Sequence, residues 1–132
     1  MDKTTRYAIS AAILTAADLM WILFYMGPKY KTLVKKIQGS DLEANMASIV
    51  GAYVLMIVGL FVFVLPRSVD TGSALRWGLL FGLVVYGIFD LTNGGIFSRW
   101  NFRLALLDMA WGSFVYAAAA LTFVFLTKRY QR

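Results

Sequence analysis

Four long apolar blocks, separated by short polar stretches, account for nearly all of the 132-residue chain. Each block is close to the roughly 20 residues that a helix needs to cross a bilayer core of about 30 Å. The pattern predicts an all-α integral membrane protein, a single four-transmembrane-helix bundle made from residues 1–132. The expected spans cover residues 7–26, 45–65, 73–93 and 104–126.

A basic amphipathic segment separates the first two blocks. Gly27 and Pro28 follow the first block and predict its end. Between residues 29 and 44, four lysines alternate with apolar residues at helical spacing. This pattern predicts a short amphipathic interfacial helix in the headgroup layer, for which we favour an anchoring role over a gating role. Its apolar positions are Tyr30, Leu33, Val34 and Ile37.

Small residues in the later spans predict close packing between helices. Gly78 and Gly82 form a G-x-x-x-G pair, and residues 117–120 are four consecutive alanines. Such surfaces let helix backbones approach one another. Because four short helices enclose little volume, we also expect a homo-oligomer whose contacts use these surfaces.

Composition limits the chemistry. The chain is 60% hydrophobic and has neither cysteine nor histidine, which excludes thiolate or imidazole metal ligands and Cys or His nucleophiles. No paired-aspartate phosphotransferase motif, nucleophile–base pair or phosphate loop is present, so we expect neither an enzyme nor a cofactor. The net charge of +6 comes from basic residues at the ends of the apolar blocks. There they meet membrane lipid headgroups, and no nucleic-acid partner is expected.

Four spans place both termini on one side of the membrane. The 13 lysines and arginines then divide almost evenly, with seven on the terminal side, Arg132 among them, and six on the other. With so small a difference between the two sides, the positive-inside rule hardly favours either orientation. We expect the termini in the cytoplasm.

Three aspartates, Asp18, Asp90 and Asp108, interrupt the apolar spans. A carboxylate at the centre of a span costs roughly 2.5–3.5 kcal/mol on insertion scales, so such residues usually face a bundle interior and mark functional sites. The alternating directions of the spans put all three in the half of the membrane opposite the termini. The one basic residue within the expected spans is Arg76, which lies near the terminal end of the third span, in the half of the membrane opposite the aspartates. We therefore expect at least one aspartate to hold a proton.

Aromatic and polar residues recur beside these aspartates at helical spacing. The pattern D-x-x-W occurs twice, and we expect each indole to lie beside the aspartate of its own motif. These pairs are Asp18 with Trp21 and Asp108 with Trp111. We interpret Asp18, Asp90, Asp108, Thr92 and Asn93 as an ion- or proton-binding site, supported by Thr15, Trp21, Tyr25, Tyr86 and Trp111. The alternative is that the aspartates only tie helices together through hydrogen bonds.

Three stretches carry a family resemblance. They are GLVVYGIFDLTN at residues 82–93, Trp100, and LDMAWG at residues 107–112. They resemble an uncharacterised and mostly bacterial membrane-protein family, domain of unknown function 2177, which carries FGL-x-x-Y-x-x-x-DLTN, a Trp in the following loop and D-x-x-WG. The first span of that family carries D-x-x-W and a Phe-Tyr pair, matched here by Asp18, Trp21, Phe24 and Tyr25.

The resemblance covers nearly the whole chain, with two departures from the family pattern. These are Gly94-Gly95 after the DLTN motif and the lysine-rich first loop. The resemblance implies a four-span fold and no established activity. It also implies that Asp18, Asp90, Asn93 and Asp108 are the polar signature of the family.

These features favour an ion or proton permeation protein, either a channel or a small transporter, with a small cation or a proton as its ligand. One alternative is a lipid-handling or metal-dependent accessory protein, in which the acidic cluster holds a divalent metal against a lipid phosphate. Another is a structural subunit of a larger membrane complex. Whether a metal binds is left open by the sequence.

Overall fold

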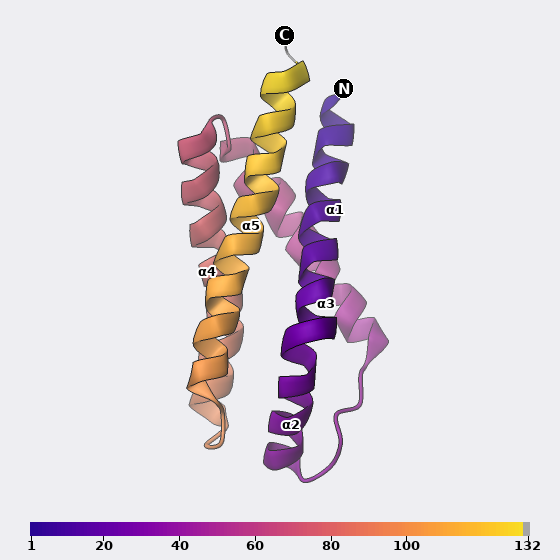
Figure 1. Cartoon of the computed structure of the whole chain (residues 1–132), viewed down its shortest axis with the longest axis vertical. Coiled ribbons are helices and arrows are strands. Elements are labelled where there is room, and N and C mark those ends of the chain that lie inside the picture. The colour runs from indigo at the N-terminus through magenta and orange to yellow at the C-terminus, as the bar shows by residue number, and fades with distance from the viewer. Residues whose placement is uncertain (131–132) are drawn as a thin grey trace.

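The computed structural model describes residues 1–130; Arg132, counted above on the terminal side, lies outside the described residues. Within residues 1–130 every regular element is a helix, and four helices are long and apolar enough to cross a membrane. They alternate in direction, so both termini lie at one end of the bundle (Figure 1) and the loops 39–45 and 97–101 lie at the other. The all-helical, four-span architecture is confirmed. The helices cover Lys3–Gln38, Met46–Arg67, Thr71–Ile96 and Phe102–Tyr130.

The first helix does not end at Gly27 and Pro28, so the predicted break there is wrong. α1 (Lys3–Trp21) passes through a π turn, η1 (Ile22–Met26), into α2 (Gly27–Gln38). The wide turn is closed by the Gly27 N–H, which donates to the carbonyl of Ile22 five residues back. A Cβ on residue 27 would press on that carbonyl oxygen. Pro28 then stands in the first turn of α2, where a proline is tolerated.

α2 continues the direction of α1 rather than crossing the end of the bundle (Figure 1). Together the three segments hold 36 residues, about 54 Å of helix, which exceeds a hydrocarbon core of about 30 Å. The amphipathic pattern predicted for this segment is present, since Leu33 is buried and the lysines are exposed. α2 is therefore an amphipathic extension of the first span.

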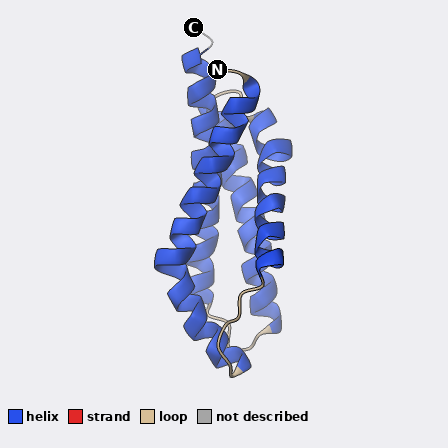
Figure 2. Cartoon of the chain, turned by 90° about the vertical axis from the view of Figure 1, so that its right-hand side faces the viewer, coloured by secondary structure: helices blue, strands red, loops and turns tan. Residues whose placement is uncertain are grey.

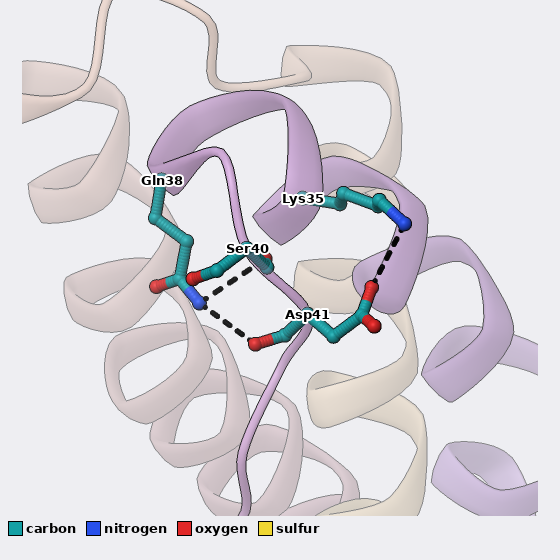
Figure 3. A network of polar contacts seen from close by, with 4 residues as sticks. All are labelled: Lys35, Gln38, Ser40 and Asp41. Atoms are coloured by element: carbon teal, nitrogen blue, oxygen red, sulfur yellow. Dashed lines mark hydrogen bonds and ion pairs between the residues drawn. The ribbon is translucent and has the colours of Figure 1, made fainter.

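A compact turn ends α2. Gly39 takes a left-handed conformation with φ of 78° and donates its N–H to the carbonyl of Lys35 at 3.0 Å, which is a common helix ending. The Gln38 side chain donates to the carbonyls of Ser40 and Asp41. Lys35 pairs with the Asp41 carboxylate at 3.0 Å, and Figure 3 shows these contacts together. The loop therefore turns sharply toward the second helix (Figure 2).

The second helix also changes its winding near its end. α3 (Met46–Gly59) begins at Asn45, whose side chain accepts from the Ser48 N–H at 3.0 Å. It continues through a second π turn, η2 (Leu60–Val64), and a short 3-10 turn, η3 (Leu65–Arg67). The first part of α3 is largely exposed, whereas η2 joins the buried core through Leu60 and Val64. The second helix is thus anchored mainly by its second half.

α4 (Thr71–Ile96) and α5 (Phe102–Tyr130) pack with their backbones in contact. Gly78 faces the backbone of Ala117, and Gly82 faces the carbonyl of Gly112, so neither glycine has room for a side chain. The tight packing predicted for the G-x-x-x-G pair is confirmed. Gly112 in turn leaves space for the ring of Tyr86, which brings that side chain into the interior.

Candidate functional site

The three aspartates of the spans are all buried. Asp18 on α1, Asp90 on α4 and Asp108 on α5 expose 2%, 0% and 6% of their surfaces. Among the described residues the one ion pair joins Lys35 to Asp41, far from all three in the chain. The buried carboxyl groups are therefore held by neutral hydrogen-bond donors, without a cationic side chain to balance their charge.

Asp18 has three such donors, each from a different helix. Its Oδ1 accepts from the Tyr86 hydroxyl at 2.5 Å and from the Trp111 indole Nε1 at 2.9 Å. Its Oδ2 accepts from the Tyr53 hydroxyl at 2.8 Å. Three donors satisfy an ionised carboxylate well, and this one residue links α1 to α3, α4 and α5.

The two D-x-x-W motifs exchange partners. Trp111 donates to Asp18, and Trp21 donates through Nε1 to Oδ1 of Asp108 at 3.0 Å. The expectation that each indole serves the aspartate of its own motif is wrong. The physical reason is that the rings of Trp21 and Trp111 stack face to face between α1 and α5, with centroids 4.7 Å apart. Each N–H therefore projects past the partner ring toward the opposite aspartate.

Asp90 and Asp108 share one tyrosine. The hydroxyl of Tyr30 lies 3.3 Å from Oδ1 of Asp90 and 3.3 Å from Oδ2 of Asp108. A phenol has one proton, so it donates to only one of these oxygens at a time. The other oxygen of Asp90, Oδ2, is buried and accepts no hydrogen bond from any side chain within residues 1–130. This pair of carboxyl groups therefore has fewer protein donors than Asp18 has.

An aromatic layer covers Tyr30 toward the loop 97–101. The ring of Trp100 stacks on Tyr30 with centroids 5.9 Å apart, and Phe89 meets both rings edge-on. Within the described residues, the indole Nε1 of Trp100 is buried without a hydrogen-bond partner. The loop is held against α2, because Arg99 donates to the carbonyl of Lys36 at 3.1 Å. These contacts place a layer of aromatic rings next to the pair formed by Asp90 and Asp108.

The structure brings some of the predicted site residues together and leaves others apart. Tyr86 and Trp111 donate to Asp18, and Trp21 donates to Asp108, so all three predicted residues contact an aspartate. The stacked rings of Trp21 and Trp111 bring these two groups together. Tyr25 is exposed, stacks on Trp21 and lies under the ammonium of Lys29.

Three further predicted residues lie outside the network. In the part of the chain that the structure describes, the side chains of Thr15, Thr92 and Asn93 form no hydrogen bond with an aspartate, and Thr92 is exposed. Thr92 follows Asp90 by two positions, about 200° around the helix, which turns it away from the interior.

Two tyrosines of the network were not predicted as site residues. In an unbroken α-helix, Tyr30 would point about 120° away from Asp18, twelve positions earlier. The π turn absorbs one extra residue per turn, which reduces the offset to about 20°. A π turn has no reliable sequence signal, and the sequence pattern alone therefore places Tyr30 on an interfacial helix. Tyr53 lies in an exposed apolar stretch of α3, and no pattern in the sequence singles it out.

No group of three or more His, Cys, Asp or Glu residues within residues 1–130 has the arrangement of a metal site.

Residues 4–125 match the model of a family described as "Predicted membrane protein (DUF2177)". The matched range contains the whole aspartate network. No curated protein and no solved structure matches the chain.

Proposed function

The chain belongs to the DUF2177 family of predicted membrane proteins, and we propose that it carries protons or small cations across the bilayer. The aspartate network is the binding site in this proposal. The observation that carries it is the sharing of the Tyr30 hydroxyl by Asp90 and Asp108, two buried carboxyl groups without a cationic partner.

Charge supplies the first argument. Carboxylates that lie close together in a low-dielectric interior cannot all be ionised cheaply, unless a proton or a cation neutralises one of them. Asp18 accepts hydrogen bonds from three neutral donors. Asp90 has one shared donor and a buried oxygen without any. The pair of Asp90 and Asp108 is therefore where a proton or cation is stabilised most.

The geometry of Tyr30 supplies the second argument. A phenol donates one hydrogen bond and accepts others. If one carboxyl group of the pair carries a proton, that group can donate to the phenol oxygen while the phenol donates to the other group. Reversing these bonds moves the proton from α4 to α5 or back without moving a helix. Such relays of buried acidic and hydroxyl groups are typical of proton pathways in membrane proteins.

A structural role is the second candidate, and Asp18 favours it. Its three donors come from three helices, so this residue would hold the bundle together whether or not anything permeates. This role also fits a subunit of a larger membrane complex. The lipid-handling or metal-dependent alternative has less support. A metal held by Asp90 and Asp108 would need carboxylate oxygens that accept hydrogen bonds from Trp21 and Tyr30.

The test is ion flux into liposomes that contain a pH-sensitive dye, with proton, sodium and potassium gradients imposed in turn. We expect flux through the parent protein and its loss in Asp90→Asn and Asp108→Asn variants that keep their helical circular dichroism. The matched control is Glu43→Gln, which removes an exposed carboxylate from the loop 39–45. Parent protein with no flux under any gradient, or aspartate variants with parental flux, would overturn the proposal.

A further inference from the structure

A groove opens on the outside of the bundle near the end that carries both termini. It has a volume of about 370 Å³ and is lined by residues of the first turns of α1 and by Phe61 of η2. Its floor is aromatic, because Tyr7 meets Phe61 and Phe123 edge-on at 5.0 and 5.2 Å between ring centroids. Phe123 is buried and supports Tyr7 from behind. The floor is therefore a fixed apolar surface.

Two cationic side chains stand beside this floor, one turn apart on α1. The ammonium of Lys3 lies 5.5 Å from the centre of the Tyr7 ring, and the guanidinium of Arg6 lies 5.9 Å from the centre of the Phe123 ring. Both charged groups are thus drawn onto the aromatic cluster by cation–π contacts. Thr4 also lines the groove.

Neither cation forms an ion pair within residues 1–130, where the one ion pair joins Lys35 to Asp41. Asp2 is the acidic residue nearest in sequence, and its carboxylate accepts the Thr5 N–H at 2.7 Å as the cap of α1. Arg6 also keeps its Nε buried without an acceptor. Lys3 is therefore the cation that lines the apolar groove, and Arg6 adds positive charge one turn further along α1.

We infer that this groove binds an anionic phospholipid. An acyl chain lies along Tyr7, Ala8 and Phe61, and the phosphate is held by Lys3, with the positive charge of Arg6 one turn away. The apolar floor favours a lipid over a free phosphate ion, because a phosphate ion has no apolar part that could pack on aromatic rings. The position also fits, because Lys3 and Arg6 lie at the start of a membrane-crossing helix, where headgroups are found. This site is separate from the aspartate network and does not depend on permeation.

The experiment is native mass spectrometry of the full chain, released from detergent containing equal amounts of phosphatidylglycerol and phosphatidylcholine with identical acyl chains. We expect the parent to retain phosphatidylglycerol preferentially. Each basic residue near the headgroups contributes about fivefold in affinity, so Lys3→Gln should reduce the preference about fivefold and Lys3→Gln with Arg6→Gln about thirtyfold. The charge-matched control is Lys31→Gln with Lys36→Gln, two exposed lysines of α2, which should leave the preference unchanged.

Two further measurements keep the inference falsifiable if the Arg6 variant folds poorly. Phe61→Ala shortens the floor and should weaken retention of phosphatidylglycerol while both cations remain. Inorganic phosphate at millimolar concentration should fail to displace the lipid. Equal retention of the two lipids by the parent, an equal loss in the α2 control, or displacement by inorganic phosphate would each overturn the inference.

Discussion

The indole rings of Trp21 and Trp111 lie parallel within 3°, with centroids 4.7 Å apart, and each donates its N–H to the aspartate of the other's motif. The two D-x-x-W motifs therefore form one unit across the contact between α1 and α5. Since these helices run in opposite directions (Figure 1), the unit has an approximate local two-fold symmetry. Each motif therefore depends on the other for the indole that donates to its aspartate.

The exchange predicts that the two indoles act together on stability. Trp21→Phe and Trp111→Phe keep a stacked ring and remove the N–H, leaving one buried carboxylate oxygen short of a donor in each variant. We expect each to lower the free energy of unfolding by about 0.5–2 kcal/mol. Because the two rings are in contact, the loss of unfolding free energy in the double variant should differ from the sum of the two single losses by at least about 0.5 kcal/mol.

The measurement is unfolding in mixed detergent micelles followed by circular dichroism. Trp77→Phe is the control, because Trp77 lies on the surface beside Arg67 and donates to no aspartate. Strictly additive losses would show that the two indole N–H groups stabilise the bundle independently of each other.

A second prediction concerns the shared hydroxyl. Tyr30→Phe keeps the ring that stacks on Trp100 and removes the proton that Asp90 and Asp108 share. If the proposed function holds, the proton flux should fall about tenfold, which corresponds to the loss of roughly 1.4 kcal/mol of hydrogen bonding in the relay. The proton flux is measured in liposomes loaded with a pH-sensitive dye.

The matched control for this variant is Tyr25→Phe. Tyr25 lies on the same long helix, is exposed, and its hydroxyl bonds to no aspartate. Equal flux through both phenylalanine variants would remove Tyr30 from the pathway while leaving the aspartates as candidates.

The sequence predicts the four spans, the close contact of α4 with α5 and the three acidic positions, because apolar length and small-residue spacing act locally along the chain. Gly78 and Gly82 are such a case, since their packing follows from their own spacing. The partners of each aspartate could not be predicted. Whether Trp21 serves Asp18 or Asp108 depends on how α1 and α5 are rotated against each other, and that rotation is a property of the assembled bundle.

A third prediction compares a central glycine of α4, Gly82, with Gly95 in the last turn of the same helix. Gly82→Ala places a Cβ against the backbone of Gly112, whereas the same change at Gly95 meets nothing within 4 Å. Overpacking of this kind costs about 1–3 kcal/mol, while glycine to alanine in an open helix position is favourable by up to about 1 kcal/mol. The midpoint of thermal unfolding, followed by tryptophan fluorescence, should therefore fall in Gly82→Ala and rise in Gly95→Ala. A parental midpoint for Gly82→Ala would mean that the two helices are not in backbone contact.

The last prediction tests whether the π turn aligns Tyr30 with the aspartates. Gly27→Ala puts a Cβ against the Ile22 carbonyl that closes the turn, so the turn should relax toward α-helical winding. That change rotates α2 by about 100° and carries the Tyr30 hydroxyl away from Asp90 and Asp108. The loss of stability caused by Gly27→Ala should then be smaller in a Tyr30→Phe background, where no hydroxyl is left to displace. Unfolding midpoints of the four proteins measure this coupling. The same loss in both backgrounds would mean that the turn and the shared hydroxyl are independent.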